Sequence, residues 1–260
     1  MSKDARHRSA ETGTAFGVDI GGSGIKGAPV DLATGEFVGE RVRIPTPQPA
    51  TPDAVARTVA EVIDSFDLPH DLPIGVTFPA VIRHGVAQSA ANVDDAWIGT
   101  DVAATIGAAT GRRVVAVNDA DAAGYAEAAY GAAKDVGGVV LVVTLGTGIG
   151  SALVVDGHLV PNTELGHLEI DGHDAESRAS DAARDRDDLI FEEWAQRLQR
   201  YFTVVENLFW PDLIVVGGGV SKKHAQFLPL LDLRTPIVPA GLRNAAGIVG
   251  AARLAANAGR

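Results

Sequence analysis

A short stretch near the start of the chain combines residue types that suit phosphate chemistry. Residues 16–27, Phe-Gly-Val-Asp-Ile-Gly-Gly-Ser-Gly-Ile-Lys-Gly, run an apolar segment into a glycine turn, with Asp19 just before the turn and Lys26 just after it. Glycine lets backbone N–H groups crowd around phosphate oxygens, and a nearby carboxylate suits a hydrated Mg²⁺ ion. A plain β-hairpin, which also needs glycine, is the alternative.

Two more glycine clusters follow strand-like segments, at residues 146–148 and 217–219. The turns at residues 21–24 and 146–148 fit neither the Rossmann fingerprint nor the Walker loop. Three such turns, two of them in corresponding positions of a repeat, favour phosphate binding over unrelated hairpins. The residues expected to hold a phosphate donor are Gly21, Gly22, Ser23, Gly24, Lys26, Gly146, Thr147, Gly148, Gly218, Gly219, Lys222 and Lys223.

A second group of polar residues suits a ligand that carries hydroxyl groups. Asn118 and Asp119 end an apolar run, where they either cap the next helix or place a general base in a crevice. Glu164 and His167 lie three residues apart, so a carboxylate and an imidazole can point the same way and hold neighbouring hydroxyls. Asn92 is either a turn residue or a sugar contact.

A metal site is the weaker interpretation of the segment that follows. His167, Glu169, Asp171 and His173 alternate along the chain, so they would share one face of an extended strand. A polar strand face is the commoner meaning of such a pattern. The sequence contains no cysteine, which excludes disulfides, thiolate chemistry and cysteine zinc sites.

The composition is that of an acidic globular protein. Of 260 residues, 46% are hydrophobic and 21% charged, and the formal net charge is -11. Such a surface repels nucleic acid, so we expect no nucleic-acid partner, and a polyanionic substrate would need a local group of cations. Residues 1–14 are polar, which predicts a flexible tail without a signal peptide. No apolar run reaches the ~20 residues of a membrane span, so we expect no membrane partner.

The elements that must position these residues alternate between strands and helices. The order of strand, glycine turn and strand at residues 16–31 returns at residues 139–155, which indicates a duplicated lobe. This pattern predicts an α/β fold of two related lobes with the binding site between them. The expected strands are 16–20, 26–31, 37–44, 74–78, 114–117, 139–145, 150–155 and 213–216, and the expected helices are 53–66, 101–109, 119–130, 188–209 and 244–256.

Taken in order, these motifs resemble the ROK sugar kinases. The resemblance covers about residues 16–252, nearly the whole chain, and the ordered set is more specific than any single motif. The matching stretches are 19–26, 118–120, 145–148, 164–167 and 216–219, with 244–252 resembling the closing helix of that family.

The resemblance implies a duplicated, ribonuclease-H-like, actin-type fold, with the sugar between the lobes and the phosphoryl donor on the glycine turns. The lobes would be residues 15–118 and 119–245, and the C-terminal helix, 246–260, would pack back on the first lobe. Asp119 would be the base that accepts the proton of the sugar hydroxyl. From the residues alone, Asp19 is either an acid at the edge of the core or an indirect partner of Mg²⁺. The sugar-binding positions would be Asn92, Asn118, Asp119, Glu164, His167 and Glu176.

One departure from the family concerns zinc. Many members carry a cysteine-rich zinc loop after the histidine, whereas residues 171–180 keep only the end of that pattern, Glu176 and Ser180. We therefore expect Mg²⁺ as cofactor and no zinc. This departure, the compact length and the sequence Val-Val-Gly-Gly-Gly-Val-Ser-Lys-Lys at 215–223 look most like the actinobacterial polyphosphate glucokinases.

The resemblance thus implies a cytoplasmic, homodimeric glucokinase that uses inorganic polyphosphate, or also ATP, as donor. Lys222 and Lys223 are the candidate cations at the mouth of the cleft, although a lysine pair on a loop is more often ordinary surface. An ATP-dependent hexose kinase of the same family is the nearest alternative. A sugar-sensing repressor of that family is another class, against which the acidic charge and the short segment before Phe16 argue. A nonenzymatic nucleotide switch would not explain Glu164 and His167.

Overall fold

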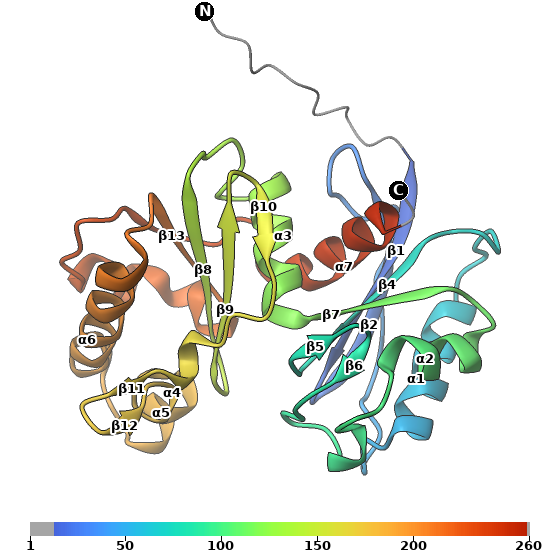
Figure 1. The fold of residues 1–260 in the computed structure, drawn as a ribbon, viewed down its shortest axis with the longest axis horizontal. Coiled ribbons are helices and arrows are strands. Elements are labelled where there is room, and N and C mark those ends of the chain that lie inside the picture. Colours follow the sequence, from blue (N-terminus) through green and yellow to red (C-terminus); the bar gives the residue numbers. More distant parts are fainter. Residues whose placement is uncertain (1–12, 259–260) are drawn as a thin grey trace, which may run out of the picture.

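The computed structural model describes residues 13–258 and folds them into two α/β lobes (Figure 1). In this part of the chain each lobe is built on a mixed five-stranded sheet. The first sheet has the order β3-β2-β1-β4-β7, formed by β1 (Thr14–Gly21), β2 (Gly24–Asp31), β3 (Val42–Ile44), β4 (Ile74–Phe78) and β7 (Val114–Asn118). The second has the order β10-β9-β8-β13-β14, formed by β8 (Val139–Leu145), β9 (Ile149–Val155), β10 (His158–Val160), β13 (Leu213–Gly217) and β14 (Ile237–Pro239).

The two sheets repeat one pattern of strand directions. In each, the first three strands form an antiparallel meander and the last two add in parallel. The duplicated two-lobe α/β fold expected from the glycine turns is therefore confirmed. Because parallel strands end at the same edge, β1, β4 and β7 bring their carboxyl ends together, and so do β8, β13 and β14.

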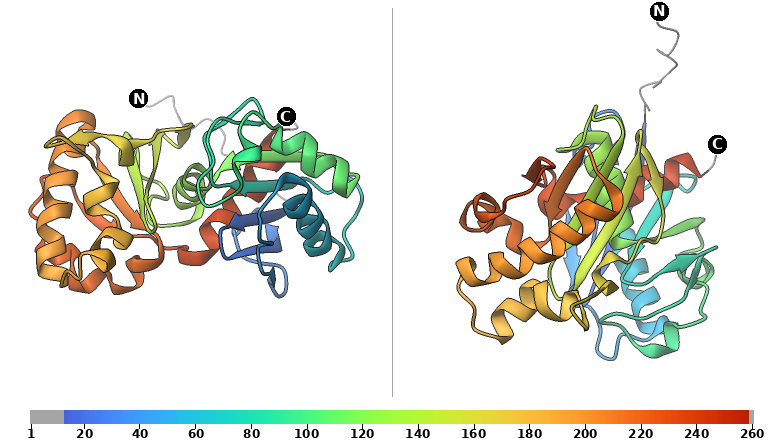
Figure 2. Two further views of the ribbon diagram at one scale, coloured as in Figure 1. Left: turned by 90° about the horizontal axis from the view of Figure 1, so that it is seen from below. Right: turned by 60° about the vertical axis from the view of Figure 1, so that its left-hand side comes forward.

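Helices cover both faces of each sheet (Figures 1 and 2). Helices α1 (Pro52–Asp64) and α2 (Val102–Thr110) lie on the outer face of the first sheet, and α6 (Phe191–Phe209) lies on that of the second. The inner helices change lobes. Helix α3 (Asp119–Tyr130) follows the first sheet but packs on β8 and β9, and α7 (Ala246–Asn257) follows the second sheet but packs on β1 and β4. Helices α3 and α7 also pack on each other between the sheets.

Short elements complete the described part of the chain. They are β5 (Ile82–Arg83), β6 (Val86–Ala87), β11 (Glu169–Ile170), β12 (His173–Asp174), α4 (Glu176–Ala179), α5 (Asp181–Arg186), and the 3-10 turns η1 (Asp95–Trp97), η2 (Leu165–His167), η3 (Gly219–Gln226), η4 (Leu228–Leu230) and η5 (Arg243–Ala245). Within residues 13–258, none of the helices has the length and apolar character that a membrane crossing requires.

Two predicted elements differ from the structure by three residues or more at their start. The strand expected at residues 37–44 shortens to β3, because Gly39 takes a φ of 96° and interrupts the extended run. The helix expected from residue 188 begins at Phe191, because Asp188 has a left-handed φ of 50°. A tail was predicted for residues 1–14. Residues 1–12 of it lie outside the described part of the chain, and β1 already begins at Thr14.

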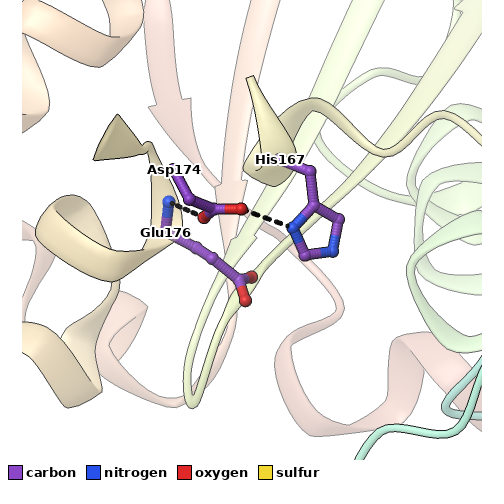
Figure 3. A group of neighbouring side chains, drawn as sticks. All are labelled: His167, Asp174 and Glu176. Atoms are coloured by element: carbon purple, nitrogen blue, oxygen red, sulfur yellow. Dashed lines mark hydrogen bonds and ion pairs between the residues drawn. The ribbon is translucent and has the colours of Figure 1, made fainter. Parts of the chain in front are cut away.

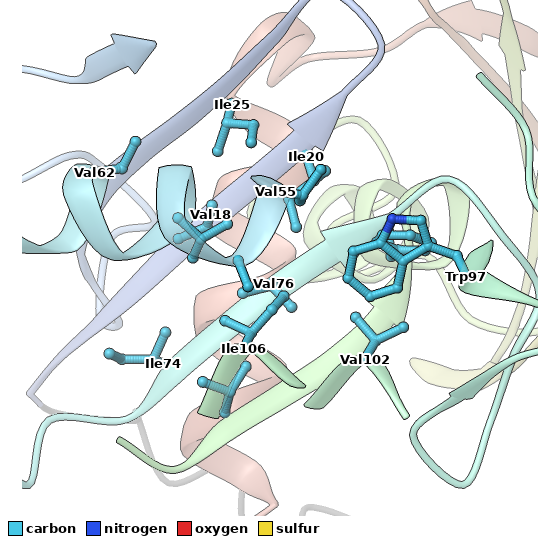
Figure 4. Packing of buried hydrophobic residues seen from close by; sticks show 14 of the residues in the cluster. Val18, Ile20, Ile25, Val55, Val62, Ile74, Val76, Trp97, Val102 and Ile106 are labelled. Carbon is cyan, nitrogen blue, oxygen red and sulfur yellow. The ribbon is translucent and has the colours of Figure 1, made fainter. Parts of the chain in front are cut away.

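Figure 4 shows the core between the first sheet and its outer helices. Val18 on β1 and Val55 and Val62 on α1 are fully buried, in agreement with the helical spacing of the apolar residues in the sequence. Trp97 is fully buried as well, and its indole N–H donates to the carbonyl of Ala50 at 3.0 Å, which satisfies the buried donor. This packing fixes the strands that carry the candidate site.

Glycine lets α7 approach its neighbours backbone to backbone. A Cβ on Gly17 of β1 would lie 1.9 Å from the carbonyl oxygen of Ile248, and one on Gly75 of β4 would lie 1.9 Å from that of Ala251. A Cβ on Gly250 of α7 would lie equally close, at 1.9 Å, to the carbonyl oxygen of Ala122 in α3. These positions accept no larger residue unless backbone moves.

Gly75→Ala tests this contact. The added methyl group would meet the carbonyl of Ala251 at 1.9 Å, so we expect the free energy of unfolding to fall by about 3 kcal/mol in urea denaturation. Gly137→Ala is the matched control, because its Cβ would meet only a carboxylate oxygen of Asp156, at 3.8 Å. Equal losses in both variants would contradict the close packing of α7.

Candidate active site

A cavity of about 680 Å³ lies between the lobes and takes its walls from both. It brings together the residues expected for a sugar and many of those expected for a phosphate donor. Outside its wall lie the first glycine turn (residues 21–24), Gly219, and the lysine pair Lys222 and Lys223. The predicted residues that line it are Asp19, Lys26, Asn92, Asn118, Asp119, Gly146, Thr147, Gly148, Glu164, His167, Glu176 and Gly218.

Asp119 lies where β7 passes into α3, and its neighbour Asn118 caps the helix. The side-chain oxygen of Asn118 accepts the N–H groups of Ala120 and Asp121 at 2.8 and 3.1 Å, and its amide donates to the carbonyl of Ala80 at 3.0 Å. The side chain of Asp119 accepts the N–H of Ala120 at Oδ1, 2.9 Å away. The helix cap and the candidate base are therefore different residues. Asn118 accepts the N–H groups at the start of α3, and the carboxylate of Asp119 remains available to the cavity.

The surroundings of Asp119 raise its pKa to about 6. The largest cause is partial loss of solvation, because protein atoms crowd the carboxylate on every side except the open cavity, to which Asp119 stays exposed. Repulsion from Asp19 comes second and repulsion from Glu164 adds less, whereas the hydrogen bond from the Ala120 N–H lowers the pKa. Such a carboxylate is ionised at pH 7 and still basic enough for proton transfer.

Asp19 is held from two sides near the end of β1. Its Oδ2 lies 3.0 Å from the ammonium group of Lys26 on β2, and its Oδ1 accepts the hydroxyl of Thr77 on β4 at 3.0 Å. The side chain of Asp19 remains 21% exposed and lines the cavity. Lys26 is thus the ion-pair partner of Asp19 rather than a free cation.

The first glycine turn is supported from behind. The guanidinium group of Arg43 on β3 donates to the carbonyl of Ser23 at 2.8 Å. On the other side a Cβ on Gly22 would lie 3.1 Å from the Cβ of Asn92, which itself lines the cavity. The turn therefore touches the cavity wall although residues 21–24 do not line it.

The second and third glycine turns meet each other. Gly218 has a φ of +83°, and a Cβ there would lie 2.1 Å from the carbonyl oxygen of Leu145, so only glycine permits this approach. Glu176 accepts the N–H of Ile149 at 3.0 Å, and a Cβ on Gly148 would lie 2.4 Å from the same carboxylate oxygen. Both turns therefore have a fixed backbone beside the cavity.

His167, Asp174 and Glu176 point toward one another (Figure 3). Nδ1 of His167 lies 2.8 Å from Oδ2 of Asp174, and the backbone N–H of Glu176 donates to Oδ1 of Asp174 at 3.2 Å. The hydrogen bond with Asp174 is the main cause of the raised pKa of His167. Because Asp174 takes up Nδ1, Nε2 is the ring nitrogen that can serve a ligand.

The alternative metal site, with polar residues sharing one strand face from His167 to His173, is not formed. The chain reverses at Asp171, where β11 and β12 pair in an antiparallel hairpin. Asp171 itself pairs with Arg200 at 2.7 Å. The alternation in the sequence therefore belongs to a turn rather than to a strand face.

The buried carboxylate of Asp121 was not singled out in the sequence. Its Oδ2 accepts the N–H of Asn162 at 2.8 Å, and its Oδ1 has no hydrogen-bond partner among the described residues. Burial is the main cause that raises the pKa of Asp121 to about 7. The side-chain amide of Asn162 pairs with both backbone groups of Ile82 at 2.9 Å, which links the second lobe to the first.

Arg243 also lines the cavity and was missed in the sequence. Arg243 lies between β14 and α7, the inner helix that packs on the first sheet. Asp174 was missed because it lies in a segment that the sequence analysis treated as part of an alternating strand.

Comparison with known proteins finds one family over most of the chain. A ROK family profile matches residues 15–183. The polyphosphate glucokinase of Mycobacterium tuberculosis is 53% identical over 238 residues, which cover 91% of this chain and 89% of that protein.

Solved structures agree with this result. The inorganic polyphosphate/ATP-glucomannokinase of Arthrobacter sp. strain KM has a TM-score of 0.91 at 58% identity, covering 95% of this chain and 100% of that chain. The ROK family glucokinase of Streptomyces griseus, solved with glucose and AMPPNP, has a TM-score of 0.79 at 23% identity, covering 94% of this chain and 100% of that chain. At that identity the second likeness shows the shared fold alone.

Asp121→Asn tests the raised pKa of the buried carboxyl. The folded pKa of about 7 exceeds the ordinary value of 3.8, so the folded protein keeps a proton that the unfolded chain loses, and stability falls as the pH rises between these values. An amide cannot ionise. We expect the free energy of unfolding of the variant, relative to wild type, to rise by about 2–3 kcal/mol from pH 5 to pH 8. Urea denaturation measures it, and a constant difference would contradict the raised pKa.

Proposed function

This chain belongs to the ROK family, and we propose that it is a glucokinase that transfers a phosphoryl group from inorganic polyphosphate to the 6-hydroxyl of glucose. The observation that carries the proposal is the place of Asp119, whose carboxylate has a pKa of about 6 in a cavity walled by glycine turns and by polar side chains. The names of relatives at 53% and 58% identity support the same reaction and the same donor.

Asp119 is the general base in this proposal. Its Oδ2 takes the proton of the 6-hydroxyl while the sugar oxygen forms its bond to phosphorus and the bond to the rest of the donor breaks. The N–H of Ala120, bonded to Oδ1, orients the carboxylate for this step. The remaining catalysis is positioning and electrostatic stabilisation of the phosphoryl group.

Other polar residues of the cavity hold the sugar. Glu164, Glu176 and Nε2 of His167 offer acceptors and a donor for ring hydroxyls, and Asn92 closes the wall beside the first glycine turn. Asn118 has one amide hydrogen left for a ligand, because its other bonds hold α3 and Ala80. Its contribution is therefore mainly structural.

The donor phosphates lie along the glycine turns in this proposal, where backbone N–H groups can bind their oxygens. The chemistry of the cavity suits Mg²⁺, because two carboxylates lie near each other in its wall. The side chain of Asp19 is partly exposed there, and it is close enough to Asp119 to raise the pKa of Asp119. Carboxylates together with phosphate oxygens form the all-oxygen ligand set that Mg²⁺ prefers. When bound, Mg²⁺ offsets the charge of the phosphates.

Zinc is not part of this proposal. His167, Asp174 and Glu176 place ligand atoms within 4.8 Å of one another, but His167 and Asp174 are exposed and already bonded to each other, and a structural zinc site has four ligands. Metal analysis of protein purified without added zinc tests this point, and stoichiometric zinc lost only on unfolding would contradict it.

That the protein is a homodimer and is located in the cytoplasm also remains a prediction.

ATP is a second donor that one observation favours. The structure at 58% identity is that of an enzyme named for both polyphosphate and ATP. Gly218 of the third glycine turn lines the cavity, where it would lie beside the adenosine end of ATP.

The reaction is tested with purified protein, glucose and Mg²⁺, with polyphosphate or ATP supplied separately and the product identified by ³¹P NMR. We expect glucose 6-phosphate with polyphosphate, loss of product on adding EDTA, and recovery with excess Mg²⁺. Product with ATP alone would contradict the donor. No product with either donor would contradict a sugar kinase.

Asp119→Asn tests the base. The amide keeps the size of the side chain but accepts no proton, so we expect turnover to fall by ~10²–10⁴ while the protein stays folded. Asp101→Asn is the matched control, because Asp101 also stands at a helix N-terminus, where it bonds the N–H of Ala104 outside the cavity. Near wild-type turnover in a folded Asp119→Asn variant would remove Asp119 from catalysis.

A further inference from the structure

The cavity is too acidic for a polyanion unless cations are placed along its path. Its wall holds the carboxylates of Asp19, Asp119, Glu164 and Glu176, which keep some exposure, against two basic side chains, Lys26 and Arg243. Lys26 is paired with Asp19 at 3.0 Å. Arg243 has no ion-pair partner within residues 13–258, and its side chain is exposed. The lysine pair expected to supply charge does not line the cavity, and the Nζ of Lys223 lies 5.8 Å from the ring of Phe191.

A buried carboxylate holds the loop that carries Arg243. Glu127 of α3 is fully buried, and its two oxygens accept the N–H groups of Gly241 and Leu242 at 3.0 and 2.8 Å. The same side chain accepts the N–H of Ala132 at 2.7 Å. The backbone immediately before Arg243 is therefore fixed by a carboxyl group that has no access to solvent.

Arg243 has a backbone conformation that glycine would adopt more easily. Its φ is +52°, in the left-handed region that L side chains rarely occupy. Residues kept in such conformations are concentrated at binding and catalytic sites, where the surrounding structure holds them. An arginine at this position therefore points to a use for its guanidinium group.

The loop also runs along the path that a donor would take. At its start Ala240 lies against the third glycine turn, where a Cβ on Gly217 would be 3.7 Å from the Cβ of Ala240. At its end Gly247 lies beside Asp19, with a Cβ placed 3.2 Å from Oδ1. Arg243 stands between these two points, on the wall of the same cavity.

From these observations we infer that Arg243 binds the donor through phosphates other than the one transferred. This inference rests on the proposed function. The planar guanidinium group gives two parallel N–H donors to a phosphate. An inorganic polyphosphate, which has charged oxygens on every unit, is the donor class that such a residue serves best.

Arg243→Gly tests the inference without straining the fold, because glycine accepts the left-handed backbone. Arg243→Lys keeps a basic side chain but loses the paired N–H donors of the guanidinium group. Arg57→Ala is the control, because it removes an exposed arginine of α1 that lies outside the cavity. We expect the KM for polyphosphate and the Kd for inorganic tripolyphosphate, measured by calorimetry, to rise about tenfold in Arg243→Gly and less in Arg243→Lys. Arg57→Ala should change neither, and the KM for glucose should stay within about twofold in all three. Because one charge is lost, the dependence of polyphosphate binding on salt should become less steep in Arg243→Gly.

Binding of tripolyphosphate separates failure of this inference from failure of the proposed function. The role of Arg243 would be overturned if the Arg243→Gly variant keeps the melting temperature of the wild type and its Kd and KM values stay within about twofold of wild type. Absence of tripolyphosphate binding by the wild-type protein would overturn it as well. Wild-type binding that Arg243→Gly weakens, without any turnover of polyphosphate, would support Arg243 and contradict the proposed donor.

Discussion

Backbone contact between helices α3 and α7 is the constraint on which the rest of the molecule depends. A Cβ on Gly250 of α7 would lie 1.9 Å from the carbonyl oxygen of Ala122 of α3, and α7 lies equally close to β1 and β4. Since α3 packs on the second sheet and α7 on the first, this contact sets the spacing of the two lobes. It also sets the spacing of charges, because α3 begins at Asp119 and the first turn of α7 lies beside Asp19.

That spacing has an electrostatic consequence. Asp119 loses solvent and faces Asp19, and together these effects raise its pKa to about 6. The same group of carboxylates that raises the pKa of Asp119 also repels an anionic donor, and under the proposed function backbone N–H groups, a bound cation and Arg243 would offset that repulsion. A protein with a net charge of -11 can in this way bind a polyanion, through local groups rather than through its overall field.

Features with a local cause could be predicted from the sequence, and features with a long-range cause could not. The glycine turns and the repeated strand order are local patterns, and the two-lobe fold followed from them. The strand at residues 37–44 was predicted too long, because the left-handed φ of Gly39 has no apolar signature. Asp121 and Arg243 were missed because the groups that define their surroundings, Asn162 and Glu127, lie far away in the sequence and meet them only in the folded chain.

The crowded junction of the lobes raises the pKa of Asp119 above that of an ordinary aspartate, as its proposed role as general base requires. A ¹³C NMR titration of the side-chain carboxyl groups measures this most directly, with the signal of Asp119 assigned by its loss in Asp119→Asn. We expect a midpoint of about 6 for that signal in the protein without substrates. A midpoint near 3.8, the ordinary value for aspartate, would show that neither the surrounding protein atoms nor Asp19 acts on this carboxylate, and would contradict the role of Asp119 as a base.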